Sequence, residues 1–245
     1  MTQTAAILII GNEILSGRTQ DTNANFIALQ LEELGITLKE IRVIPDIHET
    51  IIATAQQFHK GYDYVFTTGG IGPTHDDITA ECIAKAFAVK LEQNARAYEI
   101  LLAHYGAENL TDARLKMAQI PVGAALIHNP VSAAPGFKIE NVFVMAGVPK
   151  IMQAMWEHVK TFLAAGEPII SVTVSCGLPE SAMAEQLGVI QERYPALSIG
   201  SYPYFRMGAG GVSFVIRGTD KAAIDKAAQE IVAAVQKMGS AVSLF

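Results

Sequence analysis

The feature that most constrains this chain is the run from Asp63 to Glu81, where an apolar stretch leads through a glycine-rich turn into a helical pattern. Residues 64–68 are mostly apolar or β-branched, which predicts a buried strand of an α/β sheet. The turn that follows contains Gly69, Gly70, Gly72 and Pro73. Apolar residues then recur at helical spacing over 78–87. A strand, a glycine turn and a helix N-terminus together predict an anion site, because unpaired amides and the helix dipole favour negative charge.

Two adjacent aspartates, Asp76 and Asp77, stand at the predicted start of this helix. One of them is expected as an N-cap. A second carboxylate beside a bound phosphate is repulsive unless a divalent cation lies between them, with Mg²⁺ the first choice and Co²⁺ or Mn²⁺ also suitable. The stretch therefore predicts a metal-assisted phosphate or pyrophosphate site. A capped helix after a tight turn is the alternative interpretation.

Composition places the chain among compact α/β enzymes and excludes several partners. Half of its 245 residues are hydrophobic and 17% are charged, which argues against a disordered chain. The net charge of −6 argues against nucleic acid as a partner. The two cysteines, Cys82 and Cys176, have no metal-ligand spacing. Neither a signal peptide nor a stretch of about 20 apolar residues is present, so we expect a cytoplasmic protein that does not contact membranes.

The order of elements predicts a three-layer αβα domain with a mostly parallel sheet. Strands are expected at 5–10, 37–44 and 64–68, with helices over 26–34 and 47–59, and this alternation gives parallel strands with helices on both faces. Strands are hard to place in the polar helical region 92–119, which is expected to cover a sheet edge or to form an oligomer contact, with a dimer as the first expectation.

A linker at Gly166-Glu-Pro168 predicts a boundary between two domains, 1–166 and 167–245. Beyond it, strands are expected at 169–175, 197–202 and 211–217, with helices over 179–192 and 220–237. This βαββα order predicts a small two-layer α+β domain whose helices cover one sheet face.

Polar residues gather where the predicted strands end, which is where open α/β sheets bind ligands. Glu13 follows the first strand directly, Asp46 follows the second, and Gly147 lies at a second strand-to-helix turn. The loop 129–137 is rich in turn formers and is expected to wrap the far end of a nucleotide. Solvated loops, helix caps and a plain hairpin connection are the alternatives. The predicted substrate-binding residues are Gly11, Asn12, Asn23, Asp46, Thr68, Gly69, Gly70, Gly72, Pro73, Thr74, Thr79, Asn129, Pro135, Gly136 and Gly147.

The segment Thr68–Thr79, TGGIGPTHDDIT, resembles the signature of the molybdopterin-binding MogA/MoaB-like domain, in the form found at the N-terminus of the CinA (competence/damage-inducible protein A) family. Matching motifs occur in the same order at residues 11–17, 21–23, 116–118, 134–137 and 147–149. The C-terminal segments 177–181 and 200–203 resemble the small KH-type subdomain of that family. The chain departs from the pattern at Ser132, Ala133 and Ala146.

This resemblance implies a stand-alone version of the N-terminal part of CinA, which binds the phosphate of a nucleotide or pterin at the glycine turn. The CinA and eukaryotic FAD synthase forms are associated with metal-dependent hydrolysis of ADP-ribose or FAD pyrophosphates, whereas MogA-like relatives adenylylate molybdopterin. Asp77 matches the aspartate shared by the superfamily, and Asp76 matches the addition typical of the CinA form.

The first hypothesis is therefore a metal-dependent nucleotide pyrophosphatase. The candidate catalytic residues are Asp76, Asp77, Lys116 and Glu13. Asp76 and Asp77 are expected to hold the ion and Lys116 to neutralise the leaving phosphate. Glu13 and Asp46 are candidates for further ligands or the general base. Molybdopterin binding or adenylylation and a non-catalytic nucleotide-binding module remain as alternatives, and the sequence does not separate the ligands.

Overall fold

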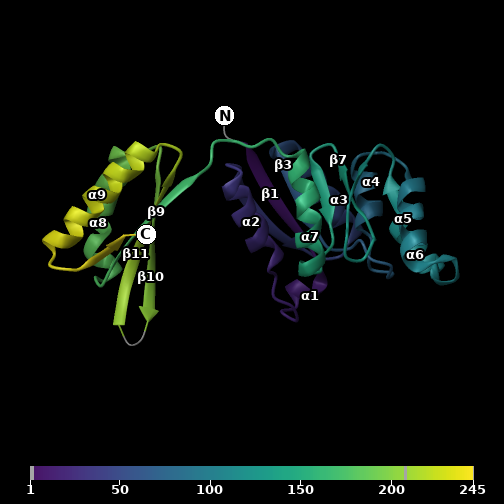
Figure 1. Ribbon diagram of the computed structural model, residues 1–245, viewed down its shortest axis with the longest axis horizontal. Helices are drawn as coiled ribbons and strands as arrows, with labels where there is room; N and C mark the ends of the chain where they lie inside the picture. Colours follow the sequence, from purple (N-terminus) through teal and green to yellow (C-terminus); the bar gives the residue numbers. More distant parts are fainter. Residues whose placement is uncertain (1–2, 207–208, 245) are drawn as a thin grey trace. The chain divides into compact units, whose positions relative to one another are not determined.

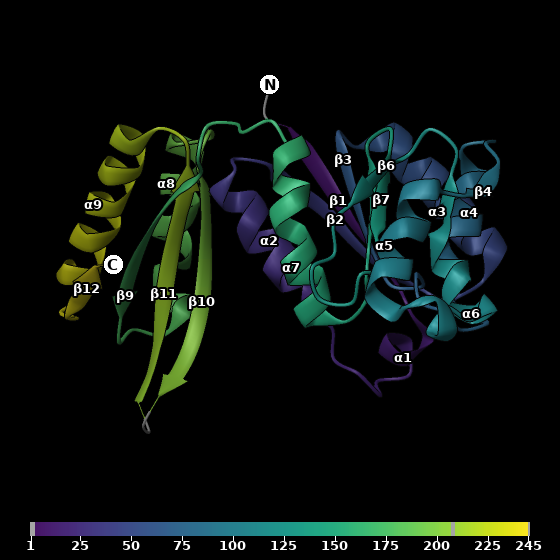
Figure 2. The same ribbon diagram turned by 45° about the vertical axis from the view of Figure 1, so that its right-hand side comes forward.

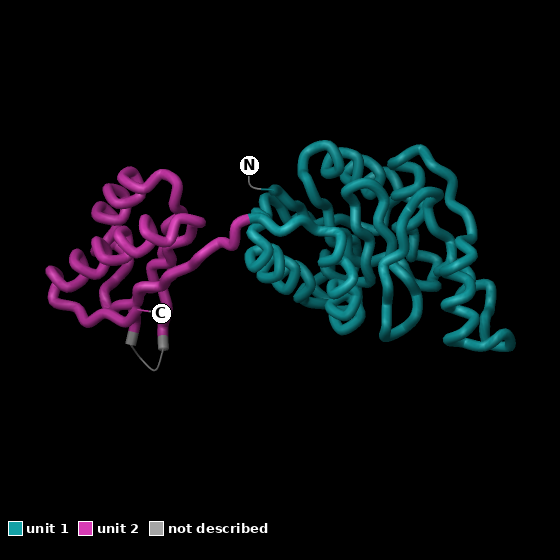
Figure 3. The backbone as a smooth tube through the Cα atoms, turned by 45° about the horizontal axis from the view of Figure 1, so that its top comes forward, with its two compact units in different colours: residues 1–166 teal, residues 167–245 magenta. Residues whose placement is uncertain are grey.

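The computed structural model describes residues 3–206 and 209–244 and divides the chain into two compact units, Met1–Gly166 and Glu167–Phe245 (Figure 3). The division follows the backbone contacts, which are dense within each unit. In the described part of the chain, no helix has both the length and the apolar character that a membrane span requires.

The first unit is built on a six-stranded sheet of order β2-β1-β3-β8-β7-β6 (Figure 1). The strands are β1 (Thr4–Ile10), β2 (Thr37–Ile44), β3 (Tyr64–Thr68), β6 (Ala125–Ile127), β7 (Gly136–Ile139) and β8 (Val142–Met145). The four strands β2, β1, β3 and β8 are parallel, and β7 and β6 continue the sheet in antiparallel order. The expected mostly parallel sheet is confirmed.

Two hydrophobic cores, one on each sheet face, make this unit a three-layer αβα domain. Alternate residues of β1 enter opposite cores, with Leu8 in one and Ile7 in the other. The helices α3 (His48–Gly61), α4 (Thr79–Ala86) and α5 (Ala95–Tyr105) cover the first core. The helices α2 (Asn23–Glu33) and α7 (Pro149–Val159) cover the second core, where Trp156 is fully buried. Because both faces are covered, the central strands are continuously apolar.

The region 92–119 is helical in its interior but carries strands at its ends, which corrects the sequence-based expectation. The strands β4 (Leu91–Gln93) and β5 (Gln119–Pro121) pair antiparallel, with Glu92 opposite Ile120. Between them lie α5, α6 (Asp112–Leu115) and the 3₁₀ turns Ala107–Asn109 and Lys116–Ala118. Three-residue strands show no alternation that periodicity can detect, and only tertiary structure joins them.

The aspartate pair does not open α4, so the predicted aspartate N-cap is wrong. The helix begins at Thr79, and its N-cap is Ile78, which makes no side-chain cap bond. Asp77 instead accepts the backbone N–H of Thr74 at 2.8 Å, inside the turn that precedes the helix. This local bond competes with capping, as short carboxylate side chains commonly allow.

The second unit is a four-stranded antiparallel sheet of order β10-β11-β9-β12, with helices on one face (Figure 2). Its elements are β9 (Ile170–Cys176), the 3₁₀ turn Glu180–Met183, α8 (Ala184–Arg193), β10 (Ser198–Arg206), β11 (Ala209–Gly218), α9 (Lys221–Lys237) and β12 (Val242–Leu244). One core containing Val174, Phe214 and Ile231 holds the layers together. The expected βαββα order is present, and β12 adds a strand that the sequence analysis did not place.

Candidate functional site

The turn after β3 requires glycine at two successive positions. Gly69 and Gly70 have φ values of +105° and +68°, which residues with a Cβ rarely adopt. A Cβ on Gly69 would lie 2.1 Å from the carbonyl oxygen of Ile10, and one on Gly70 would lie 2.2 Å from Oγ1 of Thr79. The buried Thr79 hydroxyl donates to the carbonyl of Gly69 at 3.0 Å and holds the turn against α4. Thr79 thus shapes the turn from beneath.

A cavity of about 550 Å³ opens beside this turn, at the carboxyl ends of β1, β3 and β8. Its volume is in the range of small-molecule sites. It brings together eleven of the residues predicted from the sequence: Glu13, Asp46, Gly69, Gly70, Gly72, Pro73, Thr74, Asp76, Asp77, Asn129 and Gly147. Segments far apart in the chain therefore meet at one site.

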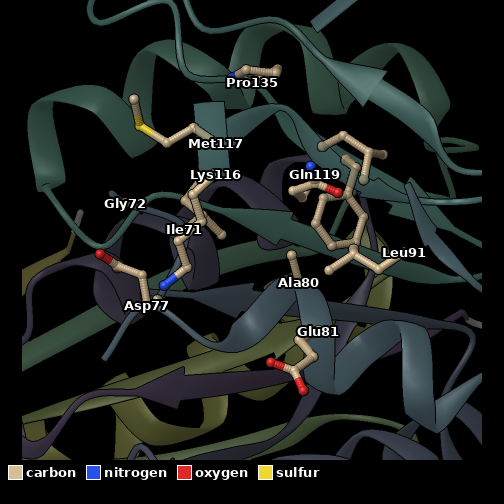
Figure 4. A pocket seen from close by; sticks show the side chains of 13 residues that line it. Ile71, Gly72, Asp77, Ala80, Glu81, Leu91, Lys116, Met117, Gln119 and Pro135 are labelled. Atoms are coloured by element: carbon tan, nitrogen blue, oxygen red, sulfur yellow. The ribbon is translucent and has the colours of Figure 1, made fainter. Parts of the chain in front are cut away.

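Two smaller pockets adjoin this cavity and contain four more of the predicted residues. Lys116 and Pro135 line a pocket of about 80 Å³ together with Asp77, and Figure 4 shows the Lys116 side chain running toward the turn that carries Asp77. Asn23 and Thr68 line a pocket of about 40 Å³ that shares Glu13 and Gly147 with the cavity. The remaining predicted residues, Gly11, Asn12, Thr79 and Gly136, line none of these three pockets.

The two aspartates share one hydroxyl group. Oγ1 of Thr74 lies 2.6 Å from Oδ1 of Asp76 and 2.5 Å from Oδ2 of Asp77. The Lys116 ammonium donates to the carbonyl of Thr74 and so binds the turn from the other side. The hydrogen bond from Thr74 lowers the pKa of Asp76, and the nearby charges of His75 and Lys116 lower it further. Asp76 therefore carries its negative charge at neutral pH.

Glu13 and Asp46 bring two further carboxylates to the cavity from the ends of β1 and β2. Oδ2 of Asp46 accepts the backbone N–H of Asn12 at 2.9 Å, which ties the start of α1 (Asn12–Leu15) to the loop after β2. The Glu13 carboxylate lies over Gly11, where a Cβ would come within 2.6 Å of it. Gly11 is thus needed for the placement of Glu13.

Asn23 and Asn129 act mainly on the backbone around the site. Asn23 is buried and donates to the carbonyl of Gly147 at 2.7 Å, which joins the start of α2 to the turn before α7. Asn129 is also buried, and its amide group makes four hydrogen bonds within its own loop, to Val131, Ser132 and Ala134. Gly136 lies too close to the carbonyl of Val144 for a Cβ, at 2.3 Å. These residues give the walls their shape.

The cavity also contains residues that the sequence analysis did not assign to it, chiefly Tyr105 and Arg114. The Arg114 guanidinium lies over the Tyr105 ring, 4.2 Å from its centroid. Both residues belong to the region 92–119. In the sequence, only their nearness to Lys116 along the chain indicated that they belong to the site. No residue spacing predicts that the end of α5 contacts α6.

The donor set fits a metal that keeps water and substrate oxygens as ligands. No group of three or more His, Cys, Asp or Glu side chains within residues 3–206 and 209–244 is arranged to hold a metal ion. Asp76, Asp77 and the Thr74 hydroxyl offer only oxygen atoms. Mg²⁺ is commonly bound by one or two carboxylates plus phosphate oxygens, so two aspartates suffice for it when a phosphate ligand is present.

Comparison with known proteins identifies the two parts of the chain. Residues 6–165 match the family described as "Probable molybdopterin binding domain", and residues 168–241 match the "FAD synthase, middle domain". A protein of Archaeoglobus fulgidus is 37% identical over 91% of this chain and 94% of its own length. One of Sulfurisphaera tokodaii is 37% identical over 81% of this chain and 80% of its own length.

Among solved structures, the protein CinA of Thermoplasma acidophilum, described as of unknown function, is 36% identical with a TM-score of 0.63. The match covers 66% of this chain and 98% of that one. The chain therefore belongs to the CinA-like branch of the molybdopterin-binding-domain (MogA/MoaB-like) family.

Proposed function

We propose that this protein hydrolyses the pyrophosphate bond of nucleotides such as ADP-ribose or FAD with a divalent metal ion. The family names point to a pterin or nucleotide as the ligand. The choice of hydrolysis rests on the paired aspartates, because a protein that only binds phosphate gains nothing from two carboxylates facing it.

The observation that carries the proposal is the hydroxyl of Thr74 between the two carboxylates. A hydroxyl has one proton and can donate to only one acceptor at a time. Its contacts of 2.6 Å with Asp76 and 2.5 Å with Asp77 therefore include one pair of oxygens with no proton between them. Since the pKa of Asp76 is lowered, a cation is a better neutralising partner than a second proton.

The glycine turn supplies the phosphate-binding groups. Among the described residues, the backbone N–H groups of Gly70, Ile71 and Gly72 have no protein acceptor, and all three residues line the cavity. Successive unpaired amides form a concave site for an anion. A phosphate bound there lies beside Asp76 and Asp77, where a shared metal ion offsets the repulsion.

In hydrolysis, water attacks one phosphorus atom and the bond to the bridging oxygen breaks, so ADP-ribose gives AMP and ribose 5-phosphate. The ion, when bound by Asp76 and Asp77, polarises the phosphorus and stabilises charge on the phosphate oxygens. The proposed role of Lys116 is to neutralise the leaving phosphate, and the contact of its ammonium group with the carbonyl of Thr74 supports this role. Glu13 faces the same cavity and is the candidate to accept the proton of the attacking water.

The test is product formation by the purified protein from ADP-ribose and FAD, with Mg²⁺, with Co²⁺ and with EDTA, read by mass spectrometry. Asp77→Asn is expected to lower kcat at least about a hundredfold, because metal stabilisation is worth several kcal/mol. Asp225→Asn is the matched control, since this carboxylate pairs with Lys221 on the surface of α9. Metal-dependent turnover that Asp77→Asn leaves unchanged contradicts the assignment.

Molybdopterin binding or adenylylation is the second candidate, and the match of residues 6–165 to the molybdopterin-binding family favours it. The same assay, repeated with ATP and molybdopterin as the substrates, distinguishes the two. Transfer of AMP from ATP to molybdopterin, with no hydrolysis of ADP-ribose or FAD, supports adenylylation. Tight binding without any product supports a non-catalytic module.

A further inference from the structure

Arg114 differs from Arg42, Arg96 and Arg193 because it makes no ion pair with a carboxylate among the described residues. Arg42, Arg96 and Arg193 each pair with a glutamate, at Glu40, Glu99 and Glu230 respectively. Within the described part of the chain, Arg114 pairs with no carboxylate. Its Nη1 donates to the carbonyl of Asn109 at 2.5 Å, and its guanidinium lies on the Tyr105 ring.

These two contacts fix the guanidinium but leave most of its hydrogen-bonding capacity unused. A guanidinium has five N–H donors, and the carbonyl of Asn109 takes one of them. The aromatic ring stabilises the charge and occupies one face of the plane without accepting an in-plane bond. A planar group with free donors, already ordered, is suited to bidentate binding of a phosphate.

The cavity around Arg114 makes this free cation significant. Besides Tyr105, its other ionisable residues are the four carboxylates Glu13, Asp46, Asp76 and Asp77, so Arg114 is the single basic residue among the described residues that line it. Lys116, the other nearby cation, lines the adjoining pocket and contacts Thr74. The proposed site of the first phosphate, the amides of the glycine turn with the ion, does not involve Arg114. A second phosphate in this acidic cavity is stabilised by a further cation, and Arg114 offers one beside Lys116.

We infer that Arg114, held on Tyr105, binds the second phosphate of the ligand and makes the site selective for diphosphate-containing nucleotides over monophosphates. The inference rests on the proposed placement of the first phosphate at the glycine turn. The substrate is therefore a nucleotide with two linked phosphates, one bound at the glycine turn and one bound at α6.

The experiment measures binding of ADP, AMP and adenosine in the presence of Mg²⁺ by calorimetry, for the wild-type chain and Arg114→Gln. The expected result is an increase of at least about tenfold in the Kd for ADP, the scale of losing a charge-assisted hydrogen bond, with a change of less than threefold for AMP and adenosine. Arg114→Lys, which keeps the charge but loses the planar fork, is expected to fall between the two.

Arg96→Gln is the matched control, because Arg96 lies in the same region 92–119, on α5, but is exposed, pairs with Glu99 and lines none of the described pockets. Tyr105→Leu removes the ring beneath the guanidinium and is expected to weaken ADP binding less than Arg114→Gln does. Circular dichroism and the urea midpoint establish that each variant is folded.

Equal losses for ADP and AMP in Arg114→Gln overturn the inference, as does an unchanged Kd for ADP or a wild-type chain that binds none of the three probes. The outcome is separate from that of the proposed function. Selective loss of ADP binding without hydrolysis of any dinucleotide supports the inference and refutes the pyrophosphatase. Hydrolysis of ADP-ribose with an unchanged KM in Arg114→Gln supports the pyrophosphatase and refutes the inference about Arg114.

Discussion

Two loops border the cavity, the turn 69–78 and the loop 129–135, and both are rich in residues that form turns. They use their polar groups in opposite ways. In the loop, the Asn129 side chain is buried and its hydrogen bonds stay within the loop. In the turn, Asp76 is exposed and the amides of Gly70 to Gly72 have no acceptor among the described residues.

The difference shows which polar groups are available to a ligand. A buried side chain whose donors and acceptors are all paired stabilises the fold and has little left for binding. Unpaired amides and carboxylates crowded around one hydroxyl are the groups that a ligand or ion completes. The side chain of Asn129 therefore stabilises the loop, and the turn is where we propose that the ligand and the ion bind.

The largest expected effect is at the base of the turn, where Gly69→Ala tests whether the backbone at Gly69 tolerates a side chain. A Cβ would lie 2.1 Å from the backbone oxygen of Ile10, at a φ of +105°. Strain and overpacking together predict a loss of about 3 kcal/mol or more in the free energy of unfolding. Urea denaturation measures it. A loss below about 1 kcal/mol contradicts the geometry.

Gly72→Ala is the matched substitution at the tip of the turn. There a Cβ would meet the side-chain oxygen Oδ2 of Asp77 at 2.6 Å, and the carboxylate can move. We expect the unfolding free energy to change by less than about 1 kcal/mol, while metal-dependent turnover falls because Asp77 is displaced. Equal losses of unfolding free energy in Gly69→Ala and Gly72→Ala would show that the base and the tip of the turn are equally constrained, which contradicts the prediction.

The next effect is in the loop, where Asn129→Ala removes four hydrogen bonds and leaves the buried carbonyl of Ala134 without this partner. A loss of about 2–3 kcal/mol in unfolding free energy is expected. Asn109→Ala is the control, because its exposed side chain makes one bond, to the carbonyl of Tyr105, and its loss is expected to be under about 1 kcal/mol. Comparable losses show that Asn129 is not the organising residue.

The smallest expected effect concerns the shared hydroxyl, which Thr74→Val removes. The bond from Thr74 is the main cause of the lowered pKa of Asp76, so the pKa of Asp76 rises toward its ordinary value of 3.8. A carboxyl with a lowered folded pKa adds stability above its unfolded pKa and loses it as the pH falls through the folded pKa. Wild type and variant should therefore differ at neutral pH and converge below pH 3.8.

Carbon-13 NMR of the metal-free protein, labelled at aspartate, measures the titration of Asp76 in the wild type and in Thr74→Val. The turn must also stay folded, because the backbone amide of Thr74 still donates to Asp77 in the variant. An Asp76 pKa that does not move in Thr74→Val shows that the hydroxyl is bonded to Asp77 alone.

Two strands of the first unit have the bounds that the sequence predicts. The expected bounds 37–44 and 64–68 are those of β2 and β3. The composition of β3 follows its burial from Val65 to Thr68, whereas β2 is mostly half-buried or exposed and buries only Ile44. The short strands β4, β5, β7 and β12 were missed, with β7 beginning inside the expected loop 129–137, since three or four residues show too little alternation to reveal a strand.

The glycine turn and its acidic residues were determined by sequence alone, because a positive φ and a close backbone contact leave glycine as the only choice. Tertiary structure decided the rest of the site. It moved Asp76 and Asp77 from the helix start into the turn, where Thr74 competes for Asp77, and it brought Arg114 and Tyr105 to the cavity. Local backbone conformation depends on single residues, such as the glycines of the turn. The contacts between side chains of separate elements depend on tertiary packing, which no short sequence pattern predicts.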